Sequence, residues 1–185
     1  MTDSRARLLS LLRTHSYREG DFLLASGRRS TFYIDVRKTS LSAEGAVLIG
    51  ECFCDTIAAQ GWDVAGVGGL TLGADPLATA TSIASWRRGR PIGAFLVRKS
   101  AKAHGSQQRI EAGGDLPDGA AVLIVDDTIT TGGSTIDAIG AARDAGYRVV
   151  AAMCVVDRGE GGAEAIAAAG VPLVSLFDIA ALRAG

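Results

Sequence analysis

Two adjacent carboxylates, Asp126 and Asp127, follow a short apolar run and precede a loop of hydroxyls and glycines. The apolar run, residues 122–125, predicts a buried parallel strand, and open α/β sheets bind ligands at the carboxyl ends of their strands. The loop consists of Thr128, Ile129, Thr130, Thr131, Gly132, Gly133, Ser134 and Thr135. Its hydroxyls and unobstructed backbone N–H groups, at the start of an expected helix, suit a phosphate. Because adjacent carboxylates suit vicinal hydroxyls, the pattern predicts a site for a phosphorylated sugar.

Two familiar phosphate-binding motifs do not fit this chain. A nucleoside triphosphate loop requires a lysine directly after its second glycine, and none follows Gly133. The dinucleotide motif G-x-G-x-x-G is approached at Gly66 and Gly68, but Thr71 stands where the third glycine belongs. The remaining alternative to a monophosphate loop is an ordinary acidic turn before a helix, because the same residue types are common in turns.

A second cluster, of basic and imidazole groups, follows another expected buried strand, residues 92–97. Arg98, Lys99, Lys102 and His104 lie within seven residues. Taken alone, such a charge run usually marks a solvated surface loop. Arginine is a planar bidentate donor to phosphate and lysine a compact point charge, so together they suit a pyrophosphate. A sheet that carries both clusters at its strand ends could hold two anionic groups of one ligand.

The elements that must position these clusters alternate between helix and strand. Helices are expected at residues 3–15, at 42–60 with Ser42 as N-cap, and from Pro76 onward with Asp75 as cap. Strands are expected at residues 30–36, 63–68, 92–97, 122–125, 147–156 and 172–177. This alternation predicts a parallel sheet with helices on both faces, connected by right-handed crossovers.

Composition agrees with one α/β domain that spans residues 1–185. The chain has 48% hydrophobic residues and 24 glycines, enough for a sizeable core. Its net charge of -1 gives no general attraction to nucleic acid or to an anionic membrane. Residues 1–20 predict neither a signal peptide nor a membrane span, so we expect a cytoplasmic protein. The three cysteines predict no disulfide framework and are expected to be structural.

Five segments together resemble the orotate phosphoribosyltransferases, members of the type I phosphoribosyltransferase family, over nearly the whole chain. The segments are LLASGRRSTFYIDVRK, VGGLTLGADP, VRKSAKAHG, VLIVDDTITTGGST and VVDRGEGG. The resemblance implies a central, mostly parallel sheet flanked by helices, a small N-terminal hood from about residues 1–40, and a flexible basic loop. This chain departs from many members at Ala25, where they carry a lysine, and at Thr71 and Leu72, where they carry tyrosine and lysine.

The activity implied by this resemblance is transfer of the phosphoribosyl group from 5-phospho-α-D-ribose 1-diphosphate (PRPP) to N1 of orotate. The products would be orotidine 5′-monophosphate and pyrophosphate, in pyrimidine (UMP) biosynthesis. The implied catalytic residues are Lys102, which would neutralise the leaving oxygen, and Asp127. The residues implied to bind PRPP are Arg98, Lys99, Lys102, His104, Asp126, Asp127, Thr128, Ile129, Thr130, Thr131, Gly132, Gly133 and Ser134. Mg²⁺ is the implied cofactor, held through PRPP and water near the two acids, with no direct protein ligand.

The resemblance assigns orotate to Thr130 and Arg158, although Arg158 could also be half of an ordinary surface ion pair. Phe32, Tyr33 and Ile34 could cover the pyrimidine, but such residues in a strand are more often core. The family also implies a homodimer with shared active sites, in which the lysine matching Lys99 comes from the other chain.

Two alternatives remain open at this point. A purine or uracil phosphoribosyltransferase would share the PRPP loop and differ in its base site. A non-catalytic PRPP-sensing regulator would keep the sugar-phosphate loop, and usually adds a nucleic-acid-binding domain or a basic face. This nearly neutral chain has neither an appended domain nor such an electrostatic footprint, which disfavours the regulator.

Overall fold

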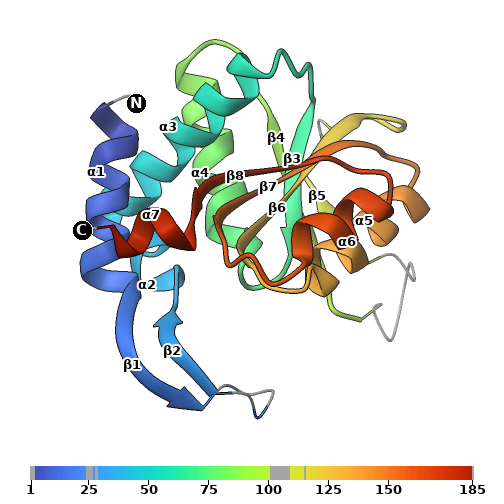
Figure 1. Cartoon of the computed structure of the whole chain (residues 1–185). Helices are drawn as coiled ribbons and strands as arrows, with labels where there is room; N and C mark the ends of the chain where they lie inside the picture. The colour runs from blue at the N-terminus through green and yellow to red at the C-terminus, as the bar shows by residue number, and fades with distance from the viewer. Residues whose placement is uncertain (1–2, 24–26, 28, 101–108, 115, 185) are drawn as a thin grey trace.

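The protein forms two sheets in a computed structural model that describes residues 3–23, 27, 29–100, 109–114 and 116–184. Within those residues, strands β1 (Tyr17–Leu23) and β2 (Arg29–Ile34) pair as an antiparallel hairpin. The hairpin projects away from the rest of the molecule (Figure 1). The main sheet has the order β5-β4-β3-β6-β7-β8. The expected mostly parallel sheet is therefore confirmed, whereas strand β1 of the hairpin was not predicted.

The main sheet changes direction of winding between β3 and β6. Its strands are β3 (Gly66–Leu70), β4 (Gly93–Val97), β5 (Ile110–Ala112), β6 (Ala121–Ile129), β7 (Arg148–Asp157) and β8 (Leu173–Asp178). From β3 the chain crosses to β4 on one side, and from β6 it crosses to β7 on the other. Ligands bind at such switch points in open α/β sheets. The short β5 runs antiparallel to β4 and had no periodic signal in the sequence.

Helices cover both faces of this sheet, as the alternation predicted. They are α1 (Asp3–Leu11), α2 (Arg37–Ser40), α3 (Ala43–Ala59), α4 (Ala74–Arg87), α5 (Gly133–Asp144), α6 (Gly162–Ala168) and α7 (Ile179–Arg183). On β6, Leu123 and Val125 join the core under α1, α3 and α4, while Val122 and Ile124 join the core under α5 and α6. Burial of both strand faces explains the continuous apolar run. None of the described helices is long and apolar enough to cross a membrane.

Of three expected boundaries, one is confirmed and two differ from the structure. The hydroxyl of Ser42 does accept a hydrogen bond from the Gly45 N–H at 3.1 Å, which confirms that N-cap. Helix α4, however, begins at Ala74, so Asp75 lies in its first turn and is not its cap. Strand β6 runs on through both acids to Ile129, because β7 continues to pair with it there. The acids therefore belong to the strand itself.

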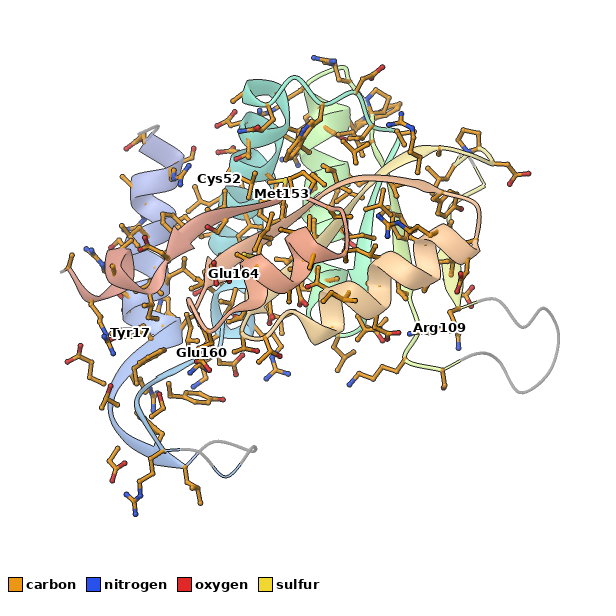
Figure 2. The ribbon with its side chains drawn as sticks, turned by 45° about the vertical axis from the view of Figure 1, so that its right-hand side comes forward. Tyr17, Cys52, Arg109, Met153, Glu160 and Glu164 are labelled. Atoms are coloured by element: carbon orange, nitrogen blue, oxygen red, sulfur yellow. The ribbon has the colours of Figure 1, made fainter. Side chains whose placement is uncertain are left out.

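The core on one face of the sheet contains side chains from α1, α3 and β7. Met153 of β7 and Cys52 of α3 share the core that α1 also enters, and both are labelled in Figure 2. All three cysteines are free and buried. Burial raises the pKa of the Cys52 thiol to about 11, so this thiol stays protonated and packs as a small apolar group.

Gly69 lets β3 approach β6 and the start of α4 closely. A Cβ at this position would lie 2.0 Å from the carbonyl oxygen of Val125 and 2.8 Å from the Cβ of Ala74.

We expect Gly69→Ala to lower the free energy of unfolding by about 3 kcal/mol or more, since backbone would have to move. Gly140 in α5 has nothing within 4 Å of such a Cβ. The matched Gly140→Ala should instead stabilise by about 0.5–1 kcal/mol. Urea denaturation of both variants tests this, and equal stabilities would contradict the close packing.

Candidate functional site

A pocket of about 400 Å³ opens at the switch point of the sheet. The chain segments that form it are the exit of the hairpin, the loop after β3, the start of the basic segment, the end of β6 and the residue after β7. The lining residues are Ile34, Asp35, Val36, Arg37, Leu70, Thr71, Leu72, Gly73, Lys99, Asp126, Asp127, Thr128, Thr130, Ser134 and Arg158. The structure thus brings the acid pair, Lys99, Arg158 and three residues of the hydroxyl loop to one cavity, whereas Thr131, Gly132 and Gly133 are not among its lining residues.

Asp126 is the buried member of the acid pair, 6% exposed. Its carboxylate accepts hydrogen bonds from Ser134 Oγ at 2.7 Å, from Thr135 Oγ1 at 3.0 Å and from the Asp127 backbone N–H at 2.9 Å. Burial raises the pKa of Asp126, and these three hydrogen bonds oppose that rise. Asp126 therefore ties the strand to the first turn of α5, and much of its hydrogen-bonding capacity is used within the protein.

Asp127 lines the pocket, and its surroundings disfavour the ionised form of its carboxyl group. Burial, and next the neighbouring Asp126 charge, raise the pKa of Asp127 to about 6. The N–H of Thr128 and the Arg37 guanidinium lower the same pKa to a smaller extent. A carboxylate held this way gains from any hydroxyl or metal-bound water that enters the pocket.

The loop between β6 and α5 presents free donors. Gly132 adopts φ = 80°, and a Cβ there would lie 3.0 Å from the Gly162 carbonyl oxygen, so glycine suits both the conformation and the space. Helix α5 starts at Gly133 with no side-chain cap on its first-turn N–H groups. A Cβ at Gly133 would meet nothing within 4 Å. Uncapped N–H groups under open space form an anion site at a helix N-terminus.

Two of the residues expected to bind PRPP lie differently from that expectation. Ile129 is 1% exposed and packs in the core, so only its backbone can serve the site, and its carbonyl already accepts the Arg158 N–H at 2.9 Å. Arg98 does not line the pocket, and its Nε donates to Glu111 at 2.7 Å. Its partner lies on β5, an element that the sequence did not predict.

The described part of the basic segment is fastened at its base. The Arg98 N–H donates to the Arg109 carbonyl at 2.8 Å, and Arg109 makes a bidentate pair with Asp137 of α5 at 2.7 and 2.6 Å. Figure 2 labels Arg109, the residue directly before β5. Lys99 lines the pocket of its own chain, whereas the family resemblance assigned the matching lysine to the other chain. Lys102 and His104 lie outside the described residues.

Arg158 is held in place from several directions. Its side chain is 9% exposed, and its Nη2 lies 2.9 Å from Glu160 Oε1. The guanidinium carbon lies 4.8 Å from the centroid of the Phe32 ring. Its Nε is buried without a hydrogen-bond partner in the described structure. A half-satisfied, buried guanidinium at a pocket wall is suited to a planar carboxylate ligand.

The hairpin contributes more than the sequence suggested. Of the three possible base-covering residues, Ile34 lines the pocket, while Phe32 and Tyr33 do not. Sequence reasoning missed Asp35 and Arg37, which line the pocket and pair at 2.9 Å. Their signal was an acid and a base directly after a strand, in a segment that we had extended as strand to residue 36.

Both departures from the family pattern can now be located. Thr71 and Leu72 line the pocket, joined by a cis peptide bond, and Leu72 is 70% exposed. Ala25 lies outside the described residues. Gly73 follows directly, and a Cβ there would lie 3.1 Å from an oxygen of each acid, Asp126 and Asp127. The loop after β3 therefore packs closely over the acid pair.

The acid pair is the part of the described site that could help to bind a metal ion. No group of three or more His, Cys, Asp or Glu side chains among the described residues could hold a metal. Asp127 has a carboxylate that faces the pocket, and Asp126 is mostly engaged. Mg²⁺ accepts few carboxylates and retains water, so this donor set fits an ion bound mainly by a ligand and by water.

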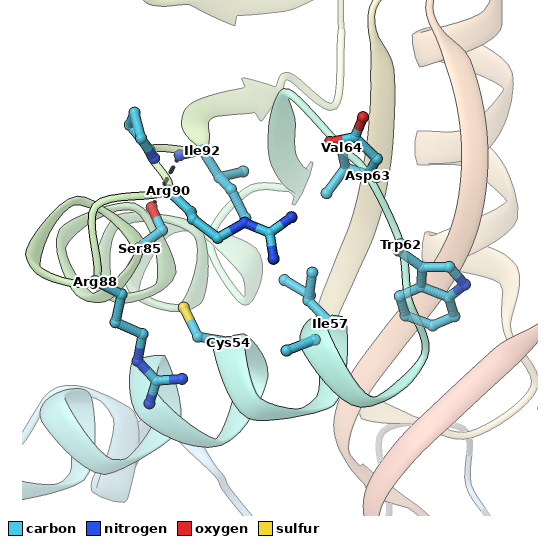
Figure 3. A pocket seen from close by; sticks show the side chains of 11 residues that line it. Cys54, Ile57, Trp62, Asp63, Val64, Ser85, Arg88, Arg90 and Ile92 are labelled. Atoms are coloured by element: carbon cyan, nitrogen blue, oxygen red, sulfur yellow. Dashed lines mark hydrogen bonds between the residues drawn. The ribbon is translucent and has the colours of Figure 1, made fainter.

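A separate pocket of about 250 Å³ lies at the opposite edge of the sheet (Figure 3). Its walls come from the ends of α3 and α4 and from the turns that enter β3 and β4, with Cys54, Trp62, Arg88 and Arg90 among them. Arg88 is already paired with Asp55 at 2.7 Å. This edge carries the amino ends of the parallel strands, so it lacks the acid pair and the hydroxyl loop.

Known proteins share this arrangement. The model of the family described as phosphoribosyl transferase domain matches residues 69–170. The orotate phosphoribosyltransferase of Thermosynechococcus vestitus is 48% identical over 184 residues, which cover 100% of this chain and 95% of that protein. A family match of this length includes the acid pair, the hydroxyl loop and Arg158.

Solved structures agree over nearly the full length. The crystal structure of Mycobacterium tuberculosis H37Rv orotate phosphoribosyltransferase in complex with Fe(III) dicitrate has a TM-score of 0.85 and 46% identity, over 97% of this chain and 98% of that chain. The same enzyme in complex with PRPP has a TM-score of 0.82 and 42% identity, over 97% and 99%. The likeness therefore covers the hairpin as well as the main sheet.

The acid pair predicts opposite stability effects for two matched variants. The pKa of Asp127 is above that of a free carboxyl. Ionisation of this group therefore lowers the free energy of unfolding as pH rises through about 4 to 6. Asp127→Asn should raise the free energy of unfolding by about 1–2 kcal/mol at pH 7.5, a gain that fades towards pH 4. Asp126→Asn should lower it by about 1–3 kcal/mol, because an amide NH₂ would face donors. Urea titrations at both pH values decide, and two destabilised variants would contradict the assignment.

Proposed function

The chain belongs to the orotate phosphoribosyltransferase family, and from that premise we propose that it transfers the phosphoribosyl group of PRPP to N1 of orotate. The products are orotidine 5′-monophosphate and pyrophosphate, and the step belongs to pyrimidine biosynthesis. The observation that carries the proposal is the convergence in one pocket of an acid pair with a phosphate loop, a lysine and a buried arginine. These are the groups that a ribose phosphate, a diphosphate and a carboxylated base require.

PRPP is the ligand for the half of the pocket around β6. The 5′-phosphate is bound by hydroxyls and N–H groups of residues 130–134, supported by the uncapped start of α5. The ribose hydroxyls are bound by Asp127, whose raised pKa reflects a charge short of partners. Asp126 has a smaller direct share, because it accepts three hydrogen bonds within the protein.

The leaving diphosphate calls for cations that act most strongly in the transition state. As the bond to pyrophosphate loosens, positive charge grows on the ribose and negative charge on the leaving oxygens. Lys99 is suited to the diphosphate by its place in the pocket wall. We assign neutralisation of the leaving oxygen to Lys102 and closure over the diphosphate to Lys102 and His104, on the family pattern alone. Arg98, paired with Glu111, supports the base of this segment.

Mg²⁺ is the proposed cofactor, and it would lie beside Asp127, bound through PRPP and water. When bound, it would offset the charge of the diphosphate. Mg²⁺ favours oxygen ligands and retains water, so substrate oxygens and the Asp127 carboxylate suit it. We propose a cytoplasmic location, supported by three free and buried thiols.

Orotate is favoured over purines and uracil by Arg158. Hypoxanthine, adenine and uracil carry no carboxylate, whereas orotate does. The buried Arg158 guanidinium is paired with Glu160 through Nη2, and its Nε N–H is left without an acceptor, which a substrate carboxylate could supply. Thr130 lines the same pocket and adds a hydroxyl for the ring carbonyls. A site built for a hydrogen-bonding group discriminates strongly against analogues that lack it.

The base specificity is tested by absorbance with purified protein, PRPP, Mg²⁺ and one base at a time. We expect consumption of orotate and not of hypoxanthine, adenine or uracil. Arg158→Ala should raise KM for orotate by about 10- to 100-fold and KM for PRPP by less than about 3-fold. Consumption of another base in place of orotate would refute the proposed substrate. Equal KM changes for both substrates would remove Arg158 from the base site.

We further propose a homodimer in which the basic segment reaches the neighbouring site. An apolar surface on α3 and α4 supports it, because Val47, Ile83 and Trp86 are 49%, 50% and 74% exposed. Helix α4, which carries Ile83 and Trp86 towards its end, begins directly after the pocket residue Gly73. Membership of the family indicates that a second copy of this chain covers the apolar surface.

Complementation in mixed dimers tests which lysine crosses between chains. Mixing Lys102→Ala with Asp127→Ala subunits should restore about a quarter of wild-type activity, since half of the dimers then hold one intact site. Lys99 lines its own pocket, so a Lys99→Ala and Asp127→Ala mixture should stay inactive and is the control. Activity in the second mixture only would mean that Lys99, and not Lys102, crosses. Inactivity of both would place the whole segment in its own chain.

A further inference from the structure

The hairpin that covers the base side of the pocket has no backbone pairing with the main sheet. Strands β1 and β2 form a separate sheet in the described structure. Figure 1 shows them extending from the body of the molecule next to the C-terminal helix α7. Backbone contacts near their root include the Asp35 N–H donating to the Ser16 carbonyl at 3.0 Å. The orientation of the remainder must therefore be set by side chains.

Arg183, in the last turn of α7, makes three contacts with this hairpin. Its Nε donates to Tyr17 Oη on β1 at 3.3 Å, and its Nη2 donates to Thr31 Oγ1 on β2 at 3.2 Å. Its guanidinium carbon also lies 4.8 Å from the centroid of the Phe32 ring. Figure 2 shows Tyr17 where the hairpin leaves the body. One side chain thus bridges both strands, 152 or more residues away in sequence.

Helix α7 is itself a firm support for this side chain. Asp178 caps it through the Ala181 N–H at 2.7 Å, and Leu182 is 2% exposed in the core. Arg13 from the opposite end of the chain donates to the Ala181 carbonyl at 2.6 Å. An N-cap, a buried leucine and a hydrogen bond from the N-terminal region together hold this short helix in place. The helix can therefore hold an arginine in a defined direction.

Phe32 connects Arg183 to the substrate side. The same ring lies 4.8 Å from the guanidinium carbon of Arg158. Two cations of like charge gather at one aromatic ring, which attracts each of them through its quadrupole. Arg158 has Glu160 as its ion-pair partner and an unpartnered Nε, so the ring is one of few groups that fix its direction.

We propose that Arg183 is a positioning residue for the base half of the site: it holds Phe32, and through Phe32 it aims Arg158 at the substrate carboxylate. The inference rests on the proposed function, because it gives Arg158 a carboxylated base to bind. Arg183 is not among the residues that line the pocket, and neither Arg183 nor α7 belongs to the segments that carry the family motifs. PRPP is held by β6 and α5, so its binding should not depend on Arg183.

Arg183→Ala should separate the two substrates kinetically. We expect KM for orotate to rise about 5- to 20-fold, and KM for PRPP and kcat to stay within about 3-fold. Arg183→Lys should give an intermediate KM, since an ammonium keeps the charge near the ring and loses the planar fork that reaches both strands. Thr31→Val removes one contact only and should raise KM for orotate slightly, which provides a mild variant if Arg183→Ala folds poorly.

A double-mutant comparison tests the route through Phe32. Phe32→Leu alone should raise KM for orotate, and adding Arg183→Ala should raise it by less than about 2-fold more, because the two residues act in series. Arg18, exposed on the same hairpin, is the matched control, and Arg18→Ala should change neither KM. Melting temperatures are recorded for every variant.

The outcomes separate this inference from the function on which it rests. Failure of the wild type to consume orotate would refute both. An active wild type with unchanged KM in Arg183→Ala and in Thr31→Val, even at a lower melting temperature, would leave Arg183 a structural residue and overturn only the inference. Additive effects of Arg183→Ala and Phe32→Leu, or equal rises in KM for PRPP, would overturn it as well.

Discussion

Burial of a pair of adjacent carboxylates at the end of a central strand is the constraint on which the site depends. Strand β6 is covered on both faces, so neither Asp126 nor Asp127 can be fully hydrated there. Asp126 is compensated within the protein by two hydroxyls and a backbone N–H, which also fixes the first turn of α5. Asp127 keeps its charge at a cost, with a pKa near 6. The protein therefore keeps a carboxylate with few partners in the pocket that we propose binds PRPP.

That local constraint explains why the donor half of the site could be predicted from sequence. The acids, the loop and the start of α5 lie within residues 126–135, and their chemistry follows from residue type and spacing. The strand boundary was misplaced, because continued pairing with β7 carries β6 through polar residues that interrupt the apolar pattern. The side chain of Ile129 lies in the core for the same reason, since alternate residues of a strand face opposite sides of the sheet.

The remaining parts of the site depend on contacts between distant segments, which periodicity does not report. Strand β1 is polar, with an exposed pattern over most of its length, so it had no strand signal. The Arg98–Glu111 pair required β5, a strand of three residues. Asp35 and Arg37 were visible as charges, but their place in the pocket follows from how the hairpin returns to α2. The resemblance to a family supplied Arg158, yet not the groups that hold it.

The two halves of the pocket consequently differ in the contacts that fix their geometry. The donor half is short in sequence and tied by hydrogen bonds to a strand with neighbours on both sides, so its geometry is set once the sheet forms. The base half joins a hairpin outside the main sheet, the residue after β7 and a C-terminal helix, and the described contacts that meet at Phe32 are between side chains. Such contacts are individually weak and can be lost singly without unfolding the sheet. Base recognition is therefore the property of this site that residues outside the pocket can alter most readily.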